Sequence, residues 1–445
     1  MLNRLFRLSE HGTTVPRELQ AGLTTFAAMA YVLAVNPNIL ADAGMDRAAL
    51  VTVTALTAAV STILMAALSN YPIALAPGMG INAFFTYTIC LTYGVPWQQA
   101  LGMVFVNGVI FLALSVTGVR EKIVRAIPYP LKIAITCGIG LFIAFIGLKN
   151  GGIIVSNPAT FVAPGDFTSG PVALCLGGIL LTLVLVARRV PGAIVLGILV
   201  MTLLGLFVPD GQGGRVTRWP ETLFSLPASP EPVFLQLRFD FLSDWSTLQR
   251  ALPLILTLLL VDMFDNIGTL IGVTKRAGLL DRNGHLPKAG RALLADSTAA
   301  ILSSLFGTST VVSYVESASG VEAGGRTGLT TVTTAVLMLL ALFLTPLILA
   351  VPAAATAPAL VIVGIFMMQS VAEIDMSDFR VAAPAVLTLL AIPFTFSIAE
   401  GIGLGLIGAA TLAVATGQPR SLPLAGYLIA LVFFLEFFHV FPFHG

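Results

Sequence analysis

Apolar residues form long runs along almost the whole chain, separated by short polar segments. A helix that crosses a lipid bilayer needs about 20 mainly apolar residues. Seven such runs precede the first long polar stretch, at 20–42, 48–69, 71–92, 97–118, 129–149, 171–188 and 190–208. Seven more follow it, at 250–273, 289–306, 308–323, 326–350, 354–372, 382–397 and 400–417. The pattern therefore predicts an all-α polytopic membrane protein of 14 spans, with a further apolar segment at 422–440 that crosses the bilayer or lies in it.

Composition supports a chain embedded in lipid and excludes several other classes. Of the 445 residues, 57% are hydrophobic and only 10% are charged, against about 25% charged residues in a soluble domain. The net charge of +1 provides no basic surface for nucleic acid. The three cysteines lie inside apolar runs, where we expect packing rather than disulfides or metal ligation. We expect no cofactor and no metal.

Positive residues predict the orientation, because cytoplasmic loops hold an excess of Lys and Arg. With the N-terminus inside, 17 of the 23 Lys and Arg residues fall on inner segments. No signal-peptide cleavage site follows a short apolar stretch, so we expect the first span to be retained. The predicted location is the plasma (inner) membrane, with a cytoplasmic N-terminus.

Two spans depart from the ordinary helix pattern, and each is the third in its set of seven. In the segment 71–90, two prolines and two glycines precede Asn82; in 307–325, a β-branched polar run leads into Glu316. Both predict a short extended piece followed by a half-helix, as in inverted-repeat transporters whose binding site lies near the membrane midplane. An odd number of spans in each half would bring the half-helix N-termini together. Alternatively, the glycines and prolines only permit close helix packing.

Acidic residues inside predicted spans are costly, so each requires a reason. Asp262, Asp265 and Thr269 recur at i, i+3 and i+7 on one helical face, with Asn266 beside them. Two carboxylates so close together in a dry site titrate as a coupled pair, which suits proton coupling. In the alternative interpretation, Asp265 caps a broken helix and Asp262 bonds a neighbouring hydroxyl.

Glu316 begins the second predicted half-helix, where a carboxylate can accept N–H bonds from a ligand or cap the helix. We place Asp296, Ser317 and Asn266 around the site as supporting residues. All four histidines lie in loops or near the C-terminus, which argues against a histidine proton relay. Glu400 and Glu436, near predicted helix ends, receive no function.

Four segments carry a resemblance to a known family. They read TTFAAMAYVLAVNP from Thr24, APGMGINAFF from Ala76, FDNIGTLIG from Phe264 and TSTVVSYVESASGVEAGGRTG from Thr308. In order and spacing the chain resembles the azg-type adenine, guanine and hypoxanthine permeases of the nucleobase-ascorbate transporter superfamily. The resemblance covers nearly the whole chain, and the last segment is long enough to be specific.

This resemblance implies seven plus seven inverted spans divided between two domains. The core domain would comprise 1–118 and 250–350, the gate domain 119–208 and 351–445, and 209–249 would form an external loop. Family members are commonly proton symporters, and the superfamily includes dimers, so a homodimer is an expectation. The family's functional positions fall on Asn82, Asp262, Asp265 and Glu316. In the uracil-permease branch, histidines follow the acidic residue of span eight, whereas Asn266 and Thr269 stand here, so that branch's proton route does not carry over.

We therefore expect a transporter, not an enzyme, that imports a purine nucleobase with a proton as the coupling ion. In this hypothesis Glu316 and Asp265 accept N–H bonds from the base, backbone N–H groups bond its acceptors, and Phe264, Phe84 or Phe85 stacks on it. Asp262 is the expected proton partner. The main alternative is a sulfate or bicarbonate transporter of the same architecture. An intramembrane aspartyl protease is disfavoured, because both aspartates share one helical turn and no GxGD motif occurs; a channel would lack saturable, proton-dependent uptake.

Overall fold

The computed structural model describes residues 2–117, 128–279 and 287–437, without the side chains of 264–265, 267–268, 271–272, 275–276 and 436. The elements of the first half are α1 (Leu2–Phe6), α2 (Val15–Met29), α3 (Val32–Ala41), α4 (Arg47–Ser69), β1 (Leu75–Pro77), α5 (Met79–Ala83), a π-helix (Phe84–Thr92), α6 (Trp97–Thr117), α8 (Tyr129–Asn150), β2 (Ile154–Asn157), β3 (Phe161–Pro164), α9 (Gly170–Ala187) and α10 (Ala193–Gly205).

The second half begins after a long irregular segment. Its elements are a 3₁₀ turn (Asp240–Leu242), α11 (Trp245–Arg276), α12 (Ala289–Phe306), β4 (Val311–Ser313), α13 (Ser317–Glu322), α14 (Gly328–Ala341), α15 (Thr345–Leu349), α16 (Ala353–Met368), α17 (Phe379–Thr395), α18 (Ile398–Ala415) and α19 (Leu424–Phe437). Short 3₁₀ turns at Leu342–Leu344, Gln369–Glu373 and Pro419–Ser421 link or extend these helices.

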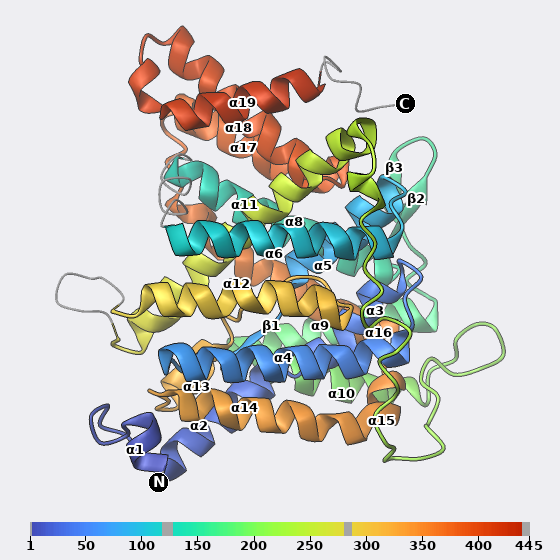
Figure 1. Cartoon of the computed structure of the whole chain (residues 1–445). Coiled ribbons are helices and arrows are strands. Elements are labelled where there is room, and N and C mark those ends of the chain that lie inside the picture. Colours follow the sequence, from blue (N-terminus) through green and yellow to red (C-terminus); the bar gives the residue numbers. More distant parts are fainter. Residues whose placement is uncertain (1, 118–127, 280–286, 438–445) are drawn as a thin grey trace.

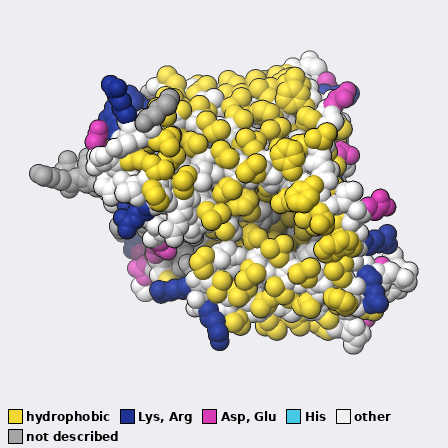
Figure 2. All heavy atoms as spheres, turned by 90° about the horizontal axis from the view of Figure 1, so that it is seen from below, with side chains coloured by type: hydrophobic (Ala, Val, Ile, Leu, Met, Phe, Trp, Pro, Cys, Tyr) yellow, Lys and Arg dark blue, Asp and Glu magenta, His cyan; other side chains and the backbone are white. Residues whose placement is uncertain are grey.

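The helical content and its hydropathy confirm a polytopic membrane protein. Within the described ranges, nine helical segments are long and apolar enough to cross a membrane, and shorter apolar helices accompany them. Figure 2 shows one side of the molecule as a broad apolar surface, with charged groups gathered towards two opposite edges. That distribution matches a lipid-facing belt between two aqueous faces.

The first crossing contains a break that the apolar pattern did not predict. The run 20–42 predicts one continuous helix, whereas α2 ends at Met29 and α3 begins at Val32. The intervening residue Tyr31 is 3% exposed. Its hydroxyl bonds Glu316 of the second half, so the break lies at a contact between the two halves of the chain.

The contacts between the helices, which Figure 1 labels, divide them into two groups. In the first bundle, which contains α2–α6 and α11–α15, α14 packs on α2 and α4, and α12 packs on α4 and α6. In the second bundle, which contains α8–α10 and α16–α19, α8 packs on α16 and α17, and α18 packs on α17 and α19. Fewer contacts join the bundles, among them α5 with α8 and α3 with α16.

Strands play a small part in this fold, and their positions differ. The β2–β3 hairpin follows α8 and its residues are partly or fully exposed, from Ile154 paired with Pro164 to Asn157 paired with Phe161. The β1–β4 pair is fully buried within the first bundle. At the C-terminal end, α19 packs against α18, which places part of the apolar run 422–440 in a helix of 14 residues.

Candidate binding site

The two interrupted spans meet through their extended pieces. Strands β1 and β4 pair antiparallel, with Leu75 opposite Ser313 and Pro77 opposite Val311. Backbone hydrogen bonds continue the ladder at both ends, from Gly78 N to Thr310 O at 3.0 Å and from Tyr314 N to Ala74 O at 2.9 Å. Each strand therefore provides hydrogen-bond partners for the backbone N–H and C=O groups of the other. Non-helical backbone inside a bilayer requires such partners.

Each strand leads directly into a short helix, as the sequence predicts. Because the strands are antiparallel, α5 and α13 leave the ribbon at opposite ends, about 10 Å apart for three residues of strand. Both short helices therefore start at the ribbon, one at each end of it. Ser317 at the start of α13 accepts a hydrogen bond from Ala74 N at 3.0 Å, which ties this helix to β1.

The glycines of the first interrupted span also serve close packing, so both interpretations of this segment apply. A Cβ on Gly80 would lie 2.6 Å from a side-chain carbon of Ile139 on α8. A Cβ on Gly78 would lie 2.9 Å from Val312 of β4. Small residues here let the first half-helix approach both the second bundle and the opposing strand.

Asn82 is the centre of a buried amide and hydroxyl network. Its Nδ2 donates to Asn36 Oδ1 on α3, and its Oδ1 accepts from the Ser309 hydroxyl. Asn36 in turn donates to Thr54 Oγ1 at 2.7 Å and to Thr308 Oγ1 at 3.3 Å. The amide of Asn82 is thus already bonded on both sides, and it joins the two interrupted spans to α3 and α4.

Glu316 lies at the junction of β4 and α13. Tyr31 Oη donates to its Oε1 at 2.7 Å. Glu316 occupies the N-cap position of α13 but its side chain makes no capping bond, so the helix-cap alternative is wrong. Protein surrounds this carboxylate, yet its side chain keeps partial exposure and the neighbouring Val315 is 53% exposed. A partly exposed acceptor group of this kind is suited to bind a ligand N–H group.

Asp262 is fully buried and is linked to β4 by hydrogen bonds. Asn107 Nδ2 on α6 donates to Asp262 Oδ2 at 3.1 Å, and Asn266 Nδ2 donates to Oδ1 at 3.3 Å. Asn266 Oδ1 also accepts from Ser313 N at 2.9 Å. The amide groups of Asn107 and Asn266 therefore both bond the Asp262 carboxylate. A change of charge on Asp262 would act on β4 through a single intervening side chain.

Other predicted site residues lie on the helices around this network, and for two of them the structure does not describe the side chain. Asp265 and Phe264 follow Asp262 on α11, but their side chains are outside the described part of the structure. Thr269, one turn further along, is 9% exposed, and Asp296 on α12 is 0% exposed. Phe84 is fully buried in the apolar core, where it packs among other side chains.

Three polar residues of the first half are prominent in the structure although the sequence analysis did not select them. Tyr31 and Asn107 bond the carboxylates described above. Glu18 on α2 is fully buried and accepts five hydrogen bonds, from backbone and hydroxyl groups of Arg326, Thr327 and Thr330 at the start of α14. Glu18 precedes the apolar run 20–42 and belongs to a charged segment, so its burial had no signal in the sequence, and a single Tyr or Asn also carries little signal.

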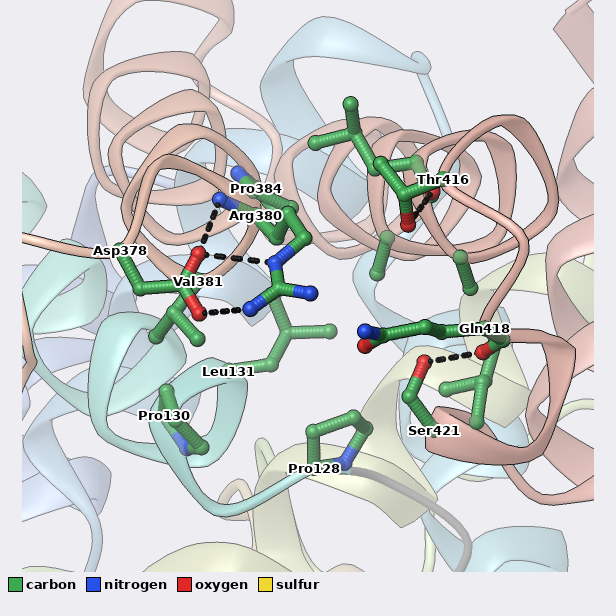
Figure 3. Close-up of a pocket in the computed structure, with 14 residues that line it drawn as sticks. Pro128, Pro130, Leu131, Asp378, Arg380, Val381, Pro384, Thr416, Gln418 and Ser421 are labelled. Atoms are coloured by element: carbon green, nitrogen blue, oxygen red, sulfur yellow. Dashed lines mark hydrogen bonds and ion pairs between the residues drawn. The ribbon is translucent and has the colours of Figure 1, made fainter.

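A separate small cavity lies away from the interrupted spans, at the ends of α8, α17 and α18 (Figure 3). Its volume is about 170 Å³, below the roughly 300 to 1,000 Å³ of typical ligand pockets. Arg380 at its edge is held by Asp378, with 3.0 Å from Nε to Oδ1 and 2.7 Å from Nη2 to Oδ2. Its charge is therefore already compensated, and the cavity is a poor candidate for the main site.

Comparison with known proteins places the chain among permeases. Residues 16–404 match the model of the family described as Permease family, Xan_ur_permease. The chain is 46% identical to a putative permease, MJ0326, of Methanocaldococcus jannaschii (99% of this chain, 98% of that one). It is 43% identical to the guanine/hypoxanthine permease PbuG of Bacillus subtilis (98% and 99%) and 41% identical to the adenine permease AdeP of Escherichia coli (98% and 96%).

The fold resembles that of a solved anion transporter. The transmembrane domain of the cyanobacterial bicarbonate transporter BicA superposes with a TM-score of 0.62 at 16% identity, covering 88% of this chain and 97% of that one. At this identity the likeness concerns the fold alone. The predicted resemblance to purine permeases and the prediction of a transporter rather than an enzyme are confirmed by the sequence matches. The chain belongs to the Xan_ur_permease family of membrane permeases.

Proposed function

We propose that this protein transports purine nucleobases across the membrane, with adenine, guanine and hypoxanthine as candidate substrates. The observation that carries the proposal is Glu316, a partly exposed acceptor at the start of the second half-helix that Tyr31 orients. Relatives that align over nearly the whole chain are named as permeases for adenine or for guanine and hypoxanthine. A purine presents ring and exocyclic N–H donors, which match a carboxylate acceptor.

The base would lie beside the β1–β4 ribbon, between α13 and α11. Glu316 would accept one N–H group, and Asp265, one turn after Asp262 on α11, would accept a second. Phe264 is the proposed stacking residue, because Phe84 is packed in the apolar core. Asn82 would stabilise the β1–β4 ribbon rather than bind the base, since both ends of its amide already bond protein groups.

We further propose that transport is coupled to protons through α11. Asp262 is the proposed proton partner, with Asp265 and Thr269 on the same face. Amide donors from Asn107 and Asn266 bond the Asp262 carboxylate, and Asn266 also accepts from the Ser313 backbone N–H group. Asp296, Ser317 and Asn266 would support this arrangement without binding the base.

Alternating access would arise from movement of the first bundle against the second. In this proposal the first bundle is the core domain and the second is the gate domain of a 14-span, seven-plus-seven inverted repeat. Four hydrogen bonds join the bundles near one membrane face. These bonds run from Asn38 Nδ2 to Thr356 Oγ1, from Thr88 Oγ1 to Phe396 O, from Asn150 Nδ2 to Tyr87 Oη and from Tyr93 Oη to Glu400 Oε1. The positive-inside rule assigns this face to the exterior, where these bonds would hold the two bundles together.

The same rule supports an N-terminus in the cytoplasm and a location in the plasma (inner) membrane. A homodimer remains part of this proposal, on the basis of the family resemblance. Both assignments can be tested by labelling engineered cysteines from either side of intact cells and by measuring the mass of the purified protein in detergent.

An inorganic anion is the alternative substrate, because the fold resembles that of a bicarbonate transporter. Uptake into proteoliposomes separates the two, using radiolabelled adenine, guanine and hypoxanthine against uracil, sulfate and bicarbonate, with and without an inward proton gradient. We expect saturable purine uptake that the gradient increases. Sulfate or bicarbonate uptake without purine uptake would overturn the proposal, and purine uptake that ignores the gradient would remove the proton.

A further inference from the structure

A pocket of about 490 Å³ lies at the membrane edge near the N-terminus. It is bounded by α1, the end of α4, the start of α12 and the first turns of α14. Three cationic residues, Arg7, Lys288 and Arg291, line it, and we call it the basic pocket. Its other lining residues are mainly apolar, including Leu5, Ile63 and Val332.

The positive charges of the basic pocket are only weakly compensated. Arg7 Nη1 lies 3.8 Å from Glu10 Oε2, and both side chains are more than 60% exposed, so this ion pair contributes little. Lys288 Nζ donates to Ser69 O, the last carbonyl of α4, at 3.1 Å. Among the described residues, no carboxylate forms an ion pair with Lys288 or Arg291. Desolvation, followed by repulsion from Arg7 and Arg291, lowers the pKa of Lys288. A bound anion would relieve that repulsion.

An apolar strip continues from the basic pocket along the side of the protein. On α4, Val60 and Ile63 are exposed, and on α14, Val336 and Leu340 are exposed at the spacing of one helical face. The helices α4 and α14 pack side by side, so the two rows adjoin. Such a row of exposed apolar side chains within the membrane belt contacts lipid acyl chains.

We propose that the basic pocket binds the phosphate-containing headgroup of an anionic phospholipid, whose acyl chains lie along the α4–α14 strip. Basic pockets between membrane helices at the cytoplasmic surface are suited to such headgroups. Arg7 and Arg291 supply guanidinium groups for two phosphate oxygens, and Lys288 adds a fixed charge held by the end of α4. Free phosphate would use the same cations, but the apolar wall and the adjoining strip favour a lipid.

The site would fix the N-terminal segment to the first bundle. Asn70, at the end of α4, donates to Phe6 O at 2.9 Å and accepts from Gly328 N at 2.9 Å, directly beside the basic pocket. A lipid headgroup there would add a further link between α1, α4 and α12. The bound lipid would stabilise the first bundle, which holds the binding site, whichever substrate is transported.

Lipid retention on the purified full-length protein tests the proposal. Native mass spectrometry would compare the binding of phosphatidylglycerol and phosphatidylcholine to the wild type and to the Arg7→Gln/Arg291→Gln variant. This variant keeps Lys288, whose ammonium bonds Ser69 O, so the end of α4 is preserved. The matched control is Arg380→Gln, which removes an arginine that Asp378 already holds (Figure 3).

We expect the wild type to prefer phosphatidylglycerol, and the double variant to lose about 25-fold in that affinity, from roughly fivefold for each basic residue. Arg380→Gln should bind phosphatidylglycerol like the wild type. Equal retention of both lipids by the wild type would overturn the proposal, as would full retention of phosphatidylglycerol by the double variant. Displacement of the lipid by millimolar inorganic phosphate would identify a free-phosphate site instead, and would also overturn it.

Discussion

Replacing Tyr31 by Phe removes one hydrogen bond from the carboxylate that we propose as the purine acceptor. The distance of 2.7 Å between Tyr31 Oη and Glu316 Oε1, and the burial of Tyr31, indicate a strong bond to a charged acceptor. Such bonds contribute about 1.5 to 3 kcal/mol. Because about 1.4 kcal/mol corresponds to a factor of ten, we expect Tyr31→Phe to weaken purine binding by roughly 10- to 100-fold. Equilibrium binding of radiolabelled purine to the purified protein measures this change.

The same reasoning predicts that Tyr31 acts only through Glu316. Glu316→Gln should weaken binding at least as much as Tyr31→Phe, and the double variant should be no weaker than Glu316→Gln alone, because the Tyr31 bond then orients no carboxylate. Tyr129→Phe is the matched control, since it removes a Tyr–Glu bond of 2.6 Å, to Glu373, at an exposed position outside the site. Additive losses in the double variant would refute the coupling, and unchanged binding in Glu316→Gln would refute the assignment of the site.

Three further predictions concern coupling, folding and access. Asp262→Asn should flatten the pH dependence of proteoliposome uptake while purine affinity changes by less than about threefold; an intact response to an imposed proton gradient would exclude Asp262 from coupling. Glu18→Ala removes the acceptor of five hydrogen bonds at the start of α14. It should lower the melting temperature of the purified protein by at least about 5 °C. An unchanged melting curve would show that Glu18 does not stabilise the fold. Asn150→Ala breaks the bond to Tyr87 between the bundles. It should accelerate maleimide labelling of a cysteine placed at Val35, which lines a cavity at that face. Unchanged labelling would show that this bond does not restrict access from that face.

The polytopic fold could be predicted because lipid imposes a simple length and composition rule on each crossing. The interrupted spans were also recognisable, since Pro77 and Gly78 cannot continue an ordinary helix and the polar run before Glu316 is costly in lipid. Their pairing as β1 and β4 was not predicted. Register depends on which backbone groups face one another in three dimensions, and three residues carry too little pattern to specify it.

The residues around the carboxylates were harder to predict than the carboxylates themselves. Asp262 and Glu316 stand out in apolar surroundings because charge is rare there. Their partners Asn107 and Tyr31 are ordinary residues of apolar runs, and they matter because helices distant in sequence bring them within 2.7 to 3.1 Å. The break between α2 and α3 that accompanies the Tyr31 contact has no proline or glycine at its position, so no local signal marked it.

The resemblance to a bicarbonate transporter raises the question of how one fold serves an anion in one protein and a neutral base in another. Two short helices that start at a central ribbon direct backbone N–H groups and the positive ends of their dipoles towards the site, which alone favours an anion. Here Glu316 stands at the start of α13, and Asp262 lies one hydrogen-bonded residue away from β4. A carboxylate at the helix start repels an anionic substrate and attracts an N–H donor. Selection between an inorganic anion and a neutral, donor-rich base would then depend on side chains added to a shared backbone, and Glu316→Gln should reduce purine binding without disturbing the β1–β4 ribbon.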